Sequence, residues 1–406
     1  MKNHTTLAFI GSLLILIGTA IGAGMLALPL ISAQAGFTHA IILLTAIWIL
    51  MTITGLLVLE VNLAFKARRN NFDSMAKGTL GKPGQIIAWL ACLLLLYALT
   101  AAYISGNASL VDELTQHVLH HPISNWVNAI LFTIVFGGAV FWSTRTVDLL
   151  NRWLMSVKGI TLIIMLILLM PHVHWTQLMS QPGHTHYLWA AAPIFLTAFG
   201  FHTSIPSLSN YLGPQVKKLK WIVIIGATVP FVIYILWLVC SLGIIPMLGS
   251  QSFHMIEQQG NSVGGFVLTL NNIVHSHWVS VGVNTFSNIA MTTSFLGVTL
   301  GLFDFLADAL KRSNDRFGRF QTALITFVPP LIFALLYPKG FIMALGYAAV
   351  CVAVLEVIMP ALMAYQLRRH KKLKSPYRVF GGTPLLVIVE ICGVLLIIAQ
   401  FWNSIH

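Results

Sequence analysis

Two apolar stretches of the sequence contain residues that break helices, and broken helices expose backbone groups that can bind charges. The first is GTAIGAGMLALPL, residues 18–30, with three glycines and one proline. In a helix interior each Gly costs about 1 kcal/mol and a Pro about 3 kcal/mol relative to Ala. Free N–H groups at such a break suit a carboxylate, and free carbonyls suit an ammonium or another cation. Gly22, Ala23 and Gly24 leave no bulk around this backbone, so one zwitterionic amino acid would satisfy both sets of groups.

The second stretch is PIFLTAFGFHTSIPSLSNYLG, residues 193–213, in which Gly200 and Pro206 interrupt the apolar pattern. His202 follows this glycine by two residues, and Lys158 lies within another apolar segment. An ionisable residue inside a membrane span is a functional hypothesis by default. The alternatives are a neutral histidine that satisfies freed backbone groups and a lysine that snorkels toward the membrane surface. The sequence leaves these alternatives open.

Several acidic residues also fall in or at the ends of apolar segments. Asp304 and Asp308 are four residues apart and share one helix face, and Glu60 ends the second apolar segment. We predict that these three residues form ion pairs at helix ends. The alternative is that they contact the basic loops as part of an inner gate. Glu356 and Glu390 are candidates for burial, and the sequence assigns neither of them a partner.

Transmembrane helices must hold all of these residues in place. The chain of 406 residues is 57% hydrophobic and 8% charged, whereas soluble domains carry roughly 25% charged residues.

One apolar segment, residues 262–276, is too short for a span, and we predict that it forms an amphipathic helix on the outer surface. We predict an all-α polytopic membrane protein with eleven spans, at residues 7–32, 39–65, 84–111, 126–142, 148–170, 187–212, 221–246, 278–310, 321–337, 340–367 and 384–403.

The distribution of Lys and Arg supports this arrangement of spans. With eleven spans, every Lys and Arg except Lys339 falls on one side of the membrane, as the positive-inside rule requires. This bias places the N-terminus in the cytoplasm and the C-terminus on the outer side. It also indicates that the net charge of +12 does not serve nucleic-acid binding. The first apolar run is too long for a cleaved signal peptide and predicts the first span.

Most histidines show the opposite distribution, in outer clusters such as HVLHH, HVH and HTH. Their spacings match no zinc pattern and acidic or Cys partners are scarce, so they predict polar loop residues rather than a metal site. The four cysteines all lie in apolar segments, at Cys92, Cys240, Cys351 and Cys392. We therefore predict no disulfide, no metal site and no cofactor.

The two broken stretches occupy corresponding positions in two oppositely oriented halves of the chain. Five spans separate their starts, so the first enters the membrane from the cytoplasm and the sixth from outside. Broken helices in this relation are typical of secondary transporters built from inverted repeats. The predicted repeats are residues 1–170 and 187–367, and the eleventh span, 384–403, lies outside them.

With these motifs the chain resembles the hydroxy and aromatic amino acid permeases. The similarity covers nearly the whole chain and includes LLVLEVNL, YALTAAYISG and TSFLGVTLGLFDFLAD in the second, third and eighth spans. It implies the leucine-transporter fold, a bacterial inner membrane and proton-coupled uptake of aromatic amino acids. Tyrosine is the expected substrate, with tryptophan or a broader aromatic range as the alternative. The implied partners are the substrate, protons and the lipid bilayer.

The resemblance also implies roles for particular residues of this sequence. The first break would hold the α-carboxylate and help to bind the amino group through Ala20, Ile21, Gly22, Ala23 and Gly24. The opposite break, where a Phe ring would pack on an aromatic substrate or gate it, would consist of Phe199, Gly200, Phe201 and His202. Candidate wall residues of the third and eighth spans are Tyr97, Tyr103, Asn288 and Thr292.

Two residues are candidates for proton coupling under the same resemblance. Proton-coupled relatives with this fold can place a lysine of the fifth span where sodium-coupled ones hold a cation. Lys158 would substitute its ammonium for sodium, and its deprotonation would reset the site. His202 would hydrogen-bond a phenolic hydroxyl or serve as a second proton site.

Two other classes of function lack their sequence features in this chain. A membrane-embedded hydrolase or metalloenzyme would need a nucleophile elbow, a His-Glu-x-x-His helix or a pair of carboxylates. An ion channel would need a repeated filter or a charged ring. None of these patterns occurs in the sequence, so we expect no enzyme activity.

Overall fold

The computed structural model of the chain describes residues 2–65, 71–119, 124–180, 183–213, 215–312, 315–369 and 373–405, and its regular elements in these ranges are helical. The predicted basic residues at 66–69 and 371–372 and the histidines at 120–121 and 406 lie outside the described residues. The first half contains α1 (Lys2–Ala20), η1 (Ala23–Leu26), α2 (Ala27–Ser32), η2 (Ala33–Ala35), α3 (Phe37–Ala64), α4 (Phe72–Leu119), α5 (Asn125–Trp142), α6 (Thr144–Leu169), η3 (Met170–His172) and α7 (Trp175–Ser180). The second half contains α8 (Tyr187–Ala198), η4 (His202–Ser204), α9 (Ile205–Leu212), α10 (Val216–Ile244), α11 (Phe253–Gln258), α12 (Val263–Val274), α13 (His277–Ala309), α14 (Arg316–Leu336), α15 (Phe341–Val352), the π-helical η5 (Ala353–Ile358), α16 (Met359–Arg369) and α17 (Gly382–Ile405).

The number of candidate spans agrees with the prediction. Within the described residues, ten helices are long and apolar enough to cross a membrane. A bent pair, Ala8–Ala20 and Ala23–Ala35, makes up the eleventh candidate, with an angle of 43° at its break. Helices suit this environment because each satisfies its own backbone hydrogen bonds, which lipid cannot do.

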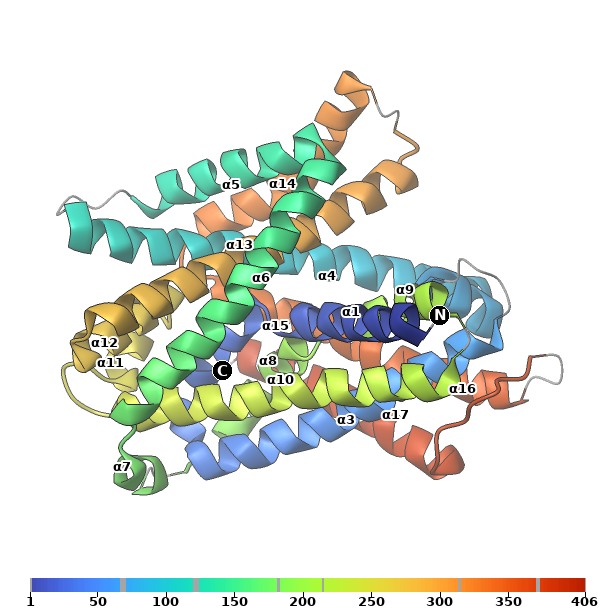
Figure 1. Cartoon of the computed structure of the whole chain (residues 1–406), viewed down its shortest axis with the longest axis horizontal. Coiled ribbons are helices and arrows are strands. Elements are labelled where there is room, and N and C mark those ends of the chain that lie inside the picture. Colours follow the sequence, from blue (N-terminus) through green and yellow to red (C-terminus); the bar gives the residue numbers. More distant parts are fainter. Residues whose placement is uncertain are drawn as a thin grey trace.

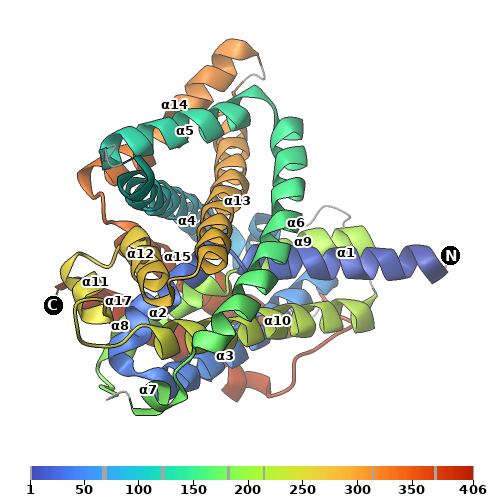
Figure 2. The same cartoon turned by 60° about the vertical axis from the view of Figure 1, so that its left-hand side comes forward.

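The spans form a bundle in which α2 of the first span packs against α8 of the sixth. In Figure 1, α1, α10 and α3 run along the long axis, and α6 crosses over α13, against which it packs. The helix α4 includes a short segment before its span, and Gly81 (φ +74°) provides the turn between them. The marked chain ends lie on opposite sides of the bundle (Figure 2).

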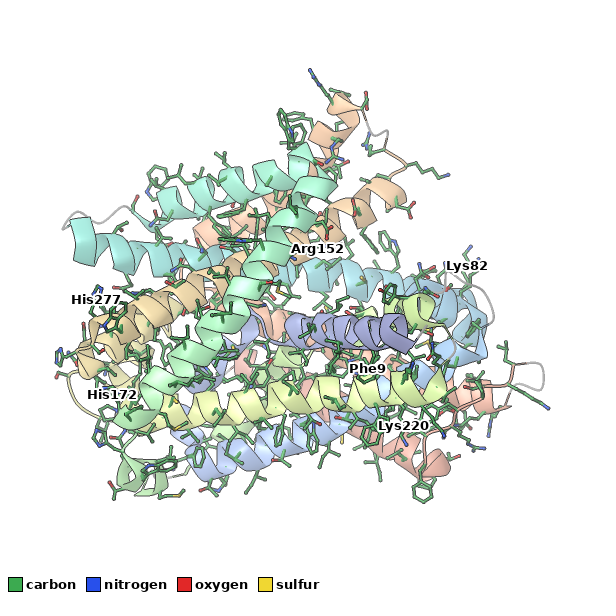
Figure 3. The ribbon with its side chains drawn as sticks, in the orientation of Figure 1. Phe9, Lys82, Arg152, His172, Lys220 and His277 are labelled. Carbon is green, nitrogen blue, oxygen red and sulfur yellow. The ribbon has the colours of Figure 1, made fainter. Side chains whose placement is uncertain are left out.

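The two ends of the bundle differ in their charged and polar residues. Lys82 and Lys220 lie toward one end, and His172 and His277 lie toward the other (Figure 3). We call the first the basic end and the second the histidine-rich end. The helix α9 leads to the basic end, where α10 begins.

The helix α12 is too short to cross the membrane, as predicted for residues 262–276. Its position is not the predicted one on the outer surface. Its first residues, Val263 to Val267, are all buried, and it packs against α4. Gly264 makes this approach possible, because a Cβ there would meet the backbone of Ser109. The helix therefore forms part of the core at the histidine-rich end.

A buried ion pair joins the ends of α3 and α16 at the basic end. Arg368 donates to both carboxylate oxygens of Glu60, at 2.8 and 2.7 Å, and the backbone N–H of Val379 donates to the same carboxylate at 2.8 Å. The two side chains are 9% and 2% exposed. The prediction of helix-end ion pairing is therefore confirmed for Glu60.

We expect Glu60→Ala to lower the stability of the protein by about 3–5 kcal/mol, because it leaves the Arg368 charge buried without its partner. The measurement is the midpoint of thermal denaturation of the purified protein in detergent. Asp148→Ala is the matched control, since its pair with Arg152 is exposed and is worth less than about 1 kcal/mol. Equal midpoints for the two variants would contradict the assignment.

Candidate functional site

The first break separates α1 from η1 at Ile21 and Gly22. The Gly22 backbone is extended (φ −133°, ψ −161°), and the N–H of Ala23 donates to Ser294 Oγ at 3.0 Å. A Cβ on Gly22 would lie 2.7 Å from the same Ser294 Oγ. A Cβ on Gly24 would lie 3.4 Å from the Ala198 Cα. The two glycines therefore allow the first span to approach the eighth and sixth spans closely.

The second break separates α8 from α9 in the sixth span. The helix α8 ends at Ala198, and residues 199–201 lead into the short η4 helix, which starts at His202. Pro206 follows in the first turn of α9, where its missing N–H costs no helical hydrogen bond. Both breaks predicted from glycine and proline are therefore present.

Tyr234 of α10 connects the two breaks. Its hydroxyl lies 2.6 Å from the carbonyl oxygen of Ala20 and 2.7 Å from that of Ala198, the last residues of α1 and α8. These carbonyls are among those that a helix end leaves unpaired. Tyr234 is not among the predicted site residues, because a tyrosine in an apolar span carries no signal of this role.

Lys158 lies at the carbonyl end of α1. Its ammonium donates to the carbonyl oxygens of Ile21 at 2.7 Å and of Gly18 at 3.4 Å, and the side chain is 4% exposed. A helix C-terminus carries a partial negative charge that favours a cation. The structure thus brings this lysine of α6 to the first break, and it does not snorkel to the membrane surface.

His202 forms a buried chain of polar contacts instead of facing the open part of the site. Its Nε2 lies 2.8 Å from Thr54 Oγ1, and its Nδ1 lies 2.7 Å from a carboxylate oxygen of Glu356. His202 is fully buried and Glu356 is 3% exposed. The structure therefore supplies the partner of Glu356 that the sequence could not assign.

A cavity of about 230 Å³ lies between the two breaks. Its walls come from the first, third, sixth, eighth and tenth spans, and they include the predicted residues Ala20, Gly22, Gly24, Gly200 and Tyr103. Ser294 and Glu356 also line it, and these two were missed as binding residues. Glu356 could have been found as a charge within an apolar span, whereas Ser294 has no distinguishing signal.

One side of the cavity lies next to α9. Thr203 lines the cavity and is exposed, and α9 continues from it to the basic end. On the opposite side, Trp237 donates to the Met25 carbonyl at 3.0 Å and packs against Phe266. Phe266 in turn stacks with Phe253. These buried rings separate the first break from the histidine-rich end.

The structure places the other predicted wall residues away from this cavity. Phe199 packs edge-on against Tyr234, and Phe201 stacks on the His202 ring beside Gly55. The Tyr97 hydroxyl donates to the Ile325 carbonyl in an apolar pocket between α4, α14 and α15. Four further candidates do not line the cavity: Ile21, Ala23, Asn288 and Thr292. The Asn288 side chain instead donates to the Asn284 carbonyl one turn earlier.

Metal-binding clusters are not found in the described ranges, where no three His, Cys, Asp or Glu side chains lie together in a way that could hold an ion. Among the described residues, the basic and acidic side chains at the two breaks are Lys158, His202 and Glu356. The cavity therefore offers backbone groups, hydroxyls and one carboxyl group to a bound solute, while the Lys158 ammonium lies behind it at the Ile21 carbonyl.

The fold is that of a multi-pass helical membrane protein. It matches the structure of a manganese transporter from Eremococcus coleocola with a TM-score of 0.63, over 97% of this chain and 85% of that one, at 11% sequence identity. The chain is thus an all-helical membrane protein with the leucine-transporter-like fold expected from the sequence.

The chain belongs to the tryptophan/tyrosine permease family, whose model matches residues 5–400. It is 40% identical to tyrosine-specific transport system 1 of Haemophilus influenzae, with 95% of each chain covered. It is 36% identical to a tryptophan-specific transport protein of Pseudomonas aeruginosa, over 98% of this chain and 95% of that one. The family resemblance carried by the motifs is therefore confirmed, and the chain is a permease rather than an enzyme.

Proposed function

We propose that this permease imports aromatic amino acids, with tyrosine as its main substrate, by symport with protons across the bacterial inner membrane. The names of its relatives support the substrate class, and the 40% identity to a tyrosine-specific system favours tyrosine over tryptophan. Residues 1–170 and 187–367 form two inverted repeats, and the span at 384–403 is an addition to them. The basic end faces the cytoplasm, so the N-terminus is cytoplasmic and the C-terminus periplasmic.

In this proposal the substrate binds between the two breaks. Its carboxylate accepts hydrogen bonds from the backbone N–H groups of the first break. One of these is the N–H of Ala23, which donates to Ser294 Oγ in the structure. The neighbouring carbonyls of the unwound segment accept from its ammonium. The aromatic ring occupies the apolar part of the cavity along Leu95, Leu99 and Leu345.

The contact between Lys158 and the Ile21 carbonyl is the observation that carries the coupling mechanism. A charged ammonium at this carbonyl stabilises the unwound end of α1, as a bound cation would. Loss of its proton removes that charge and frees the break to change conformation. This change then releases substrate and proton toward the basic end.

We expect purified protein in proteoliposomes to accumulate labelled tyrosine when a pH gradient is imposed with the alkaline side inside. An imposed sodium gradient at equal pH should drive no accumulation. Unlabelled tyrosine should compete best, followed by tryptophan, while histidine should compete poorly. Uptake driven by sodium and insensitive to pH would contradict the coupling, and failure of every aromatic amino acid to accumulate or exchange would contradict the substrate class.

A further inference from the structure

The cavity between the breaks has polar groups at two separate places on its wall. One is at the first break, where Ser294 lies against Gly22 and accepts from the Ala23 N–H, and where Tyr103 also lines the cavity. The other is at the second break, where the Glu356 carboxylate lies within van der Waals distance of a Cβ built on Gly200. Threonines of the first and sixth spans also line the cavity near the two breaks, and leucine and valine side chains of α4, α13 and α15 line it elsewhere.

Glu356 is the one charged side chain among the described residues that line this cavity. It lies in the π-helical segment η5, and one of its carboxylate oxygens is 2.7 Å from His202 Nδ1. His202 is itself fixed by Thr54 of α3, at 2.8 Å. A carboxyl group keeps acceptor capacity whether or not it carries a proton. The three residues therefore present a fixed hydrogen-bond acceptor at the wall of an otherwise mostly apolar cavity.

We propose that Glu356 accepts a hydrogen bond from the O–H or N–H group at the ring of the bound substrate, with His202 as its positioning residue. The inference rests on the proposed function, because it assumes an aromatic amino acid whose charged end binds at the first break. Tyrosine and tryptophan both carry such a donor on the ring, and phenylalanine does not. Glu356 therefore determines selection of donor-bearing rings over phenylalanine.

The physical reason is the cost of leaving a buried acceptor unpaired. A ring without a donor displaces water from the carboxylate and returns no hydrogen bond. Sites that bind a substrate hydroxyl or N–H therefore reject analogues that lack it, whereas a purely apolar pocket discriminates weakly. A single hydrogen bond to a charged group corresponds to about 10- to 100-fold in affinity.

The first test changes the ligand and leaves the protein intact. Unlabelled competitors are added to labelled tyrosine in the proteoliposome assay, in pairs that match in shape and differ in the donor. Tyrosine is paired with 4-fluorophenylalanine, and tryptophan with 3-benzothienylalanine. We expect the analogue without the donor to inhibit about 10- to 100-fold more weakly in each pair. Equal inhibition within both pairs would overturn the inference while leaving the proposed function intact, and the proposed function fails separately if no aromatic amino acid competes.

The second test changes the carboxylate. Glu356→Met keeps the length of the side chain and removes its hydrogen-bond acceptors. In this variant the affinity for tyrosine and for tryptophan should fall about 10- to 100-fold, while the affinity for 4-fluorophenylalanine should not change. Glu356→Gln, which keeps an acceptor oxygen, should retain part of the preference. Glu390→Met is the matched control, because Glu390 lies in α17 and does not line the cavity. If Glu356→Met lowers the affinity for every competitor by the same factor, the carboxylate acts on a group that all of them share, such as the substrate ammonium, or in proton transfer. That result would overturn the inference. If Glu356→Met does not fold, the ligand pairs decide the matter alone.

Discussion

Replacement of Lys158 by Gln is expected to abolish concentrative uptake driven by a pH gradient. The glutamine amide can still donate to the Ile21 carbonyl, but it brings no charge to the end of α1 and cannot take up or release a proton. A lost charged hydrogen bond of this kind corresponds to about 10- to 100-fold in rate or affinity. The measurement is the initial rate and final level of tyrosine accumulation in proteoliposomes under the imposed gradient.

Exchange of external for internal tyrosine distinguishes coupling from a loss of the fold. Exchange requires no net proton movement, so Lys158→Gln should retain it. Lys158→Arg keeps the charge but cannot lose a proton, so it should also fail to accumulate substrate. Lys220→Gln is the control, since Lys220 is exposed at the basic end. Rescue of accumulation by Lys158→Arg would show that the residue serves only as a fixed charge and would overturn the coupling role.

Substitution of Gly22 by Val is expected to produce the second large effect, a loss of substrate binding. The new Cβ would meet Ser294 Oγ at 2.7 Å, and the bond from the Ala23 N–H to that oxygen would be disturbed. The added methyl groups would also enter the cavity that Gly22 lines. Overpacking of this kind costs about 1–3 kcal/mol, which is about 5- to 160-fold in affinity.

Gly11→Val is the matched control for this prediction. It makes the same substitution in the same span, within α1, but a Cβ built there meets no neighbouring side chain or other helix within 4 Å. The measurement is the shift in thermal denaturation midpoint on adding tyrosine, together with the uptake rate. Gly11→Val should behave as the unchanged protein in both. Equal tyrosine shifts for Gly22→Val and the unchanged protein would exclude the first break as the binding site.

Much of the site's location follows from local sequence, because helix breaks are local events. Gly22, Gly24, Gly200 and Pro206 disfavour helix wherever they occur, and both predicted breaks are present in the structure. The resemblance to the permeases then identified the lysine of the fifth span as a candidate cation. Its contact with the Ile21 carbonyl is consistent with that role.

The direction in which a side chain points does not follow from local sequence. Phe199, Phe201 and His202 were expected around the aromatic ring, yet the cavity is lined by Gly200 from this break and by Glu356 from the tenth span. Tyr97 was expected at the same wall and contacts α14 instead. These spans are apolar on most of their faces, so hydrophobic periodicity cannot reveal their rotation about the helix axis.

The sequence by itself determined the number of spans, their orientation bias and the two breaks, because apolar length, basic residues and helix-breaking residues act locally. Only the tertiary structure decided the partners across the bundle. Tyr234 bridges the two breaks, and His202 pairs with Glu356, which lies 154 residues further along the chain. Such pairs form where distant helices pack, and in a membrane that packing depends on shape and polar contacts between helices rather than on a hydrophobic pattern.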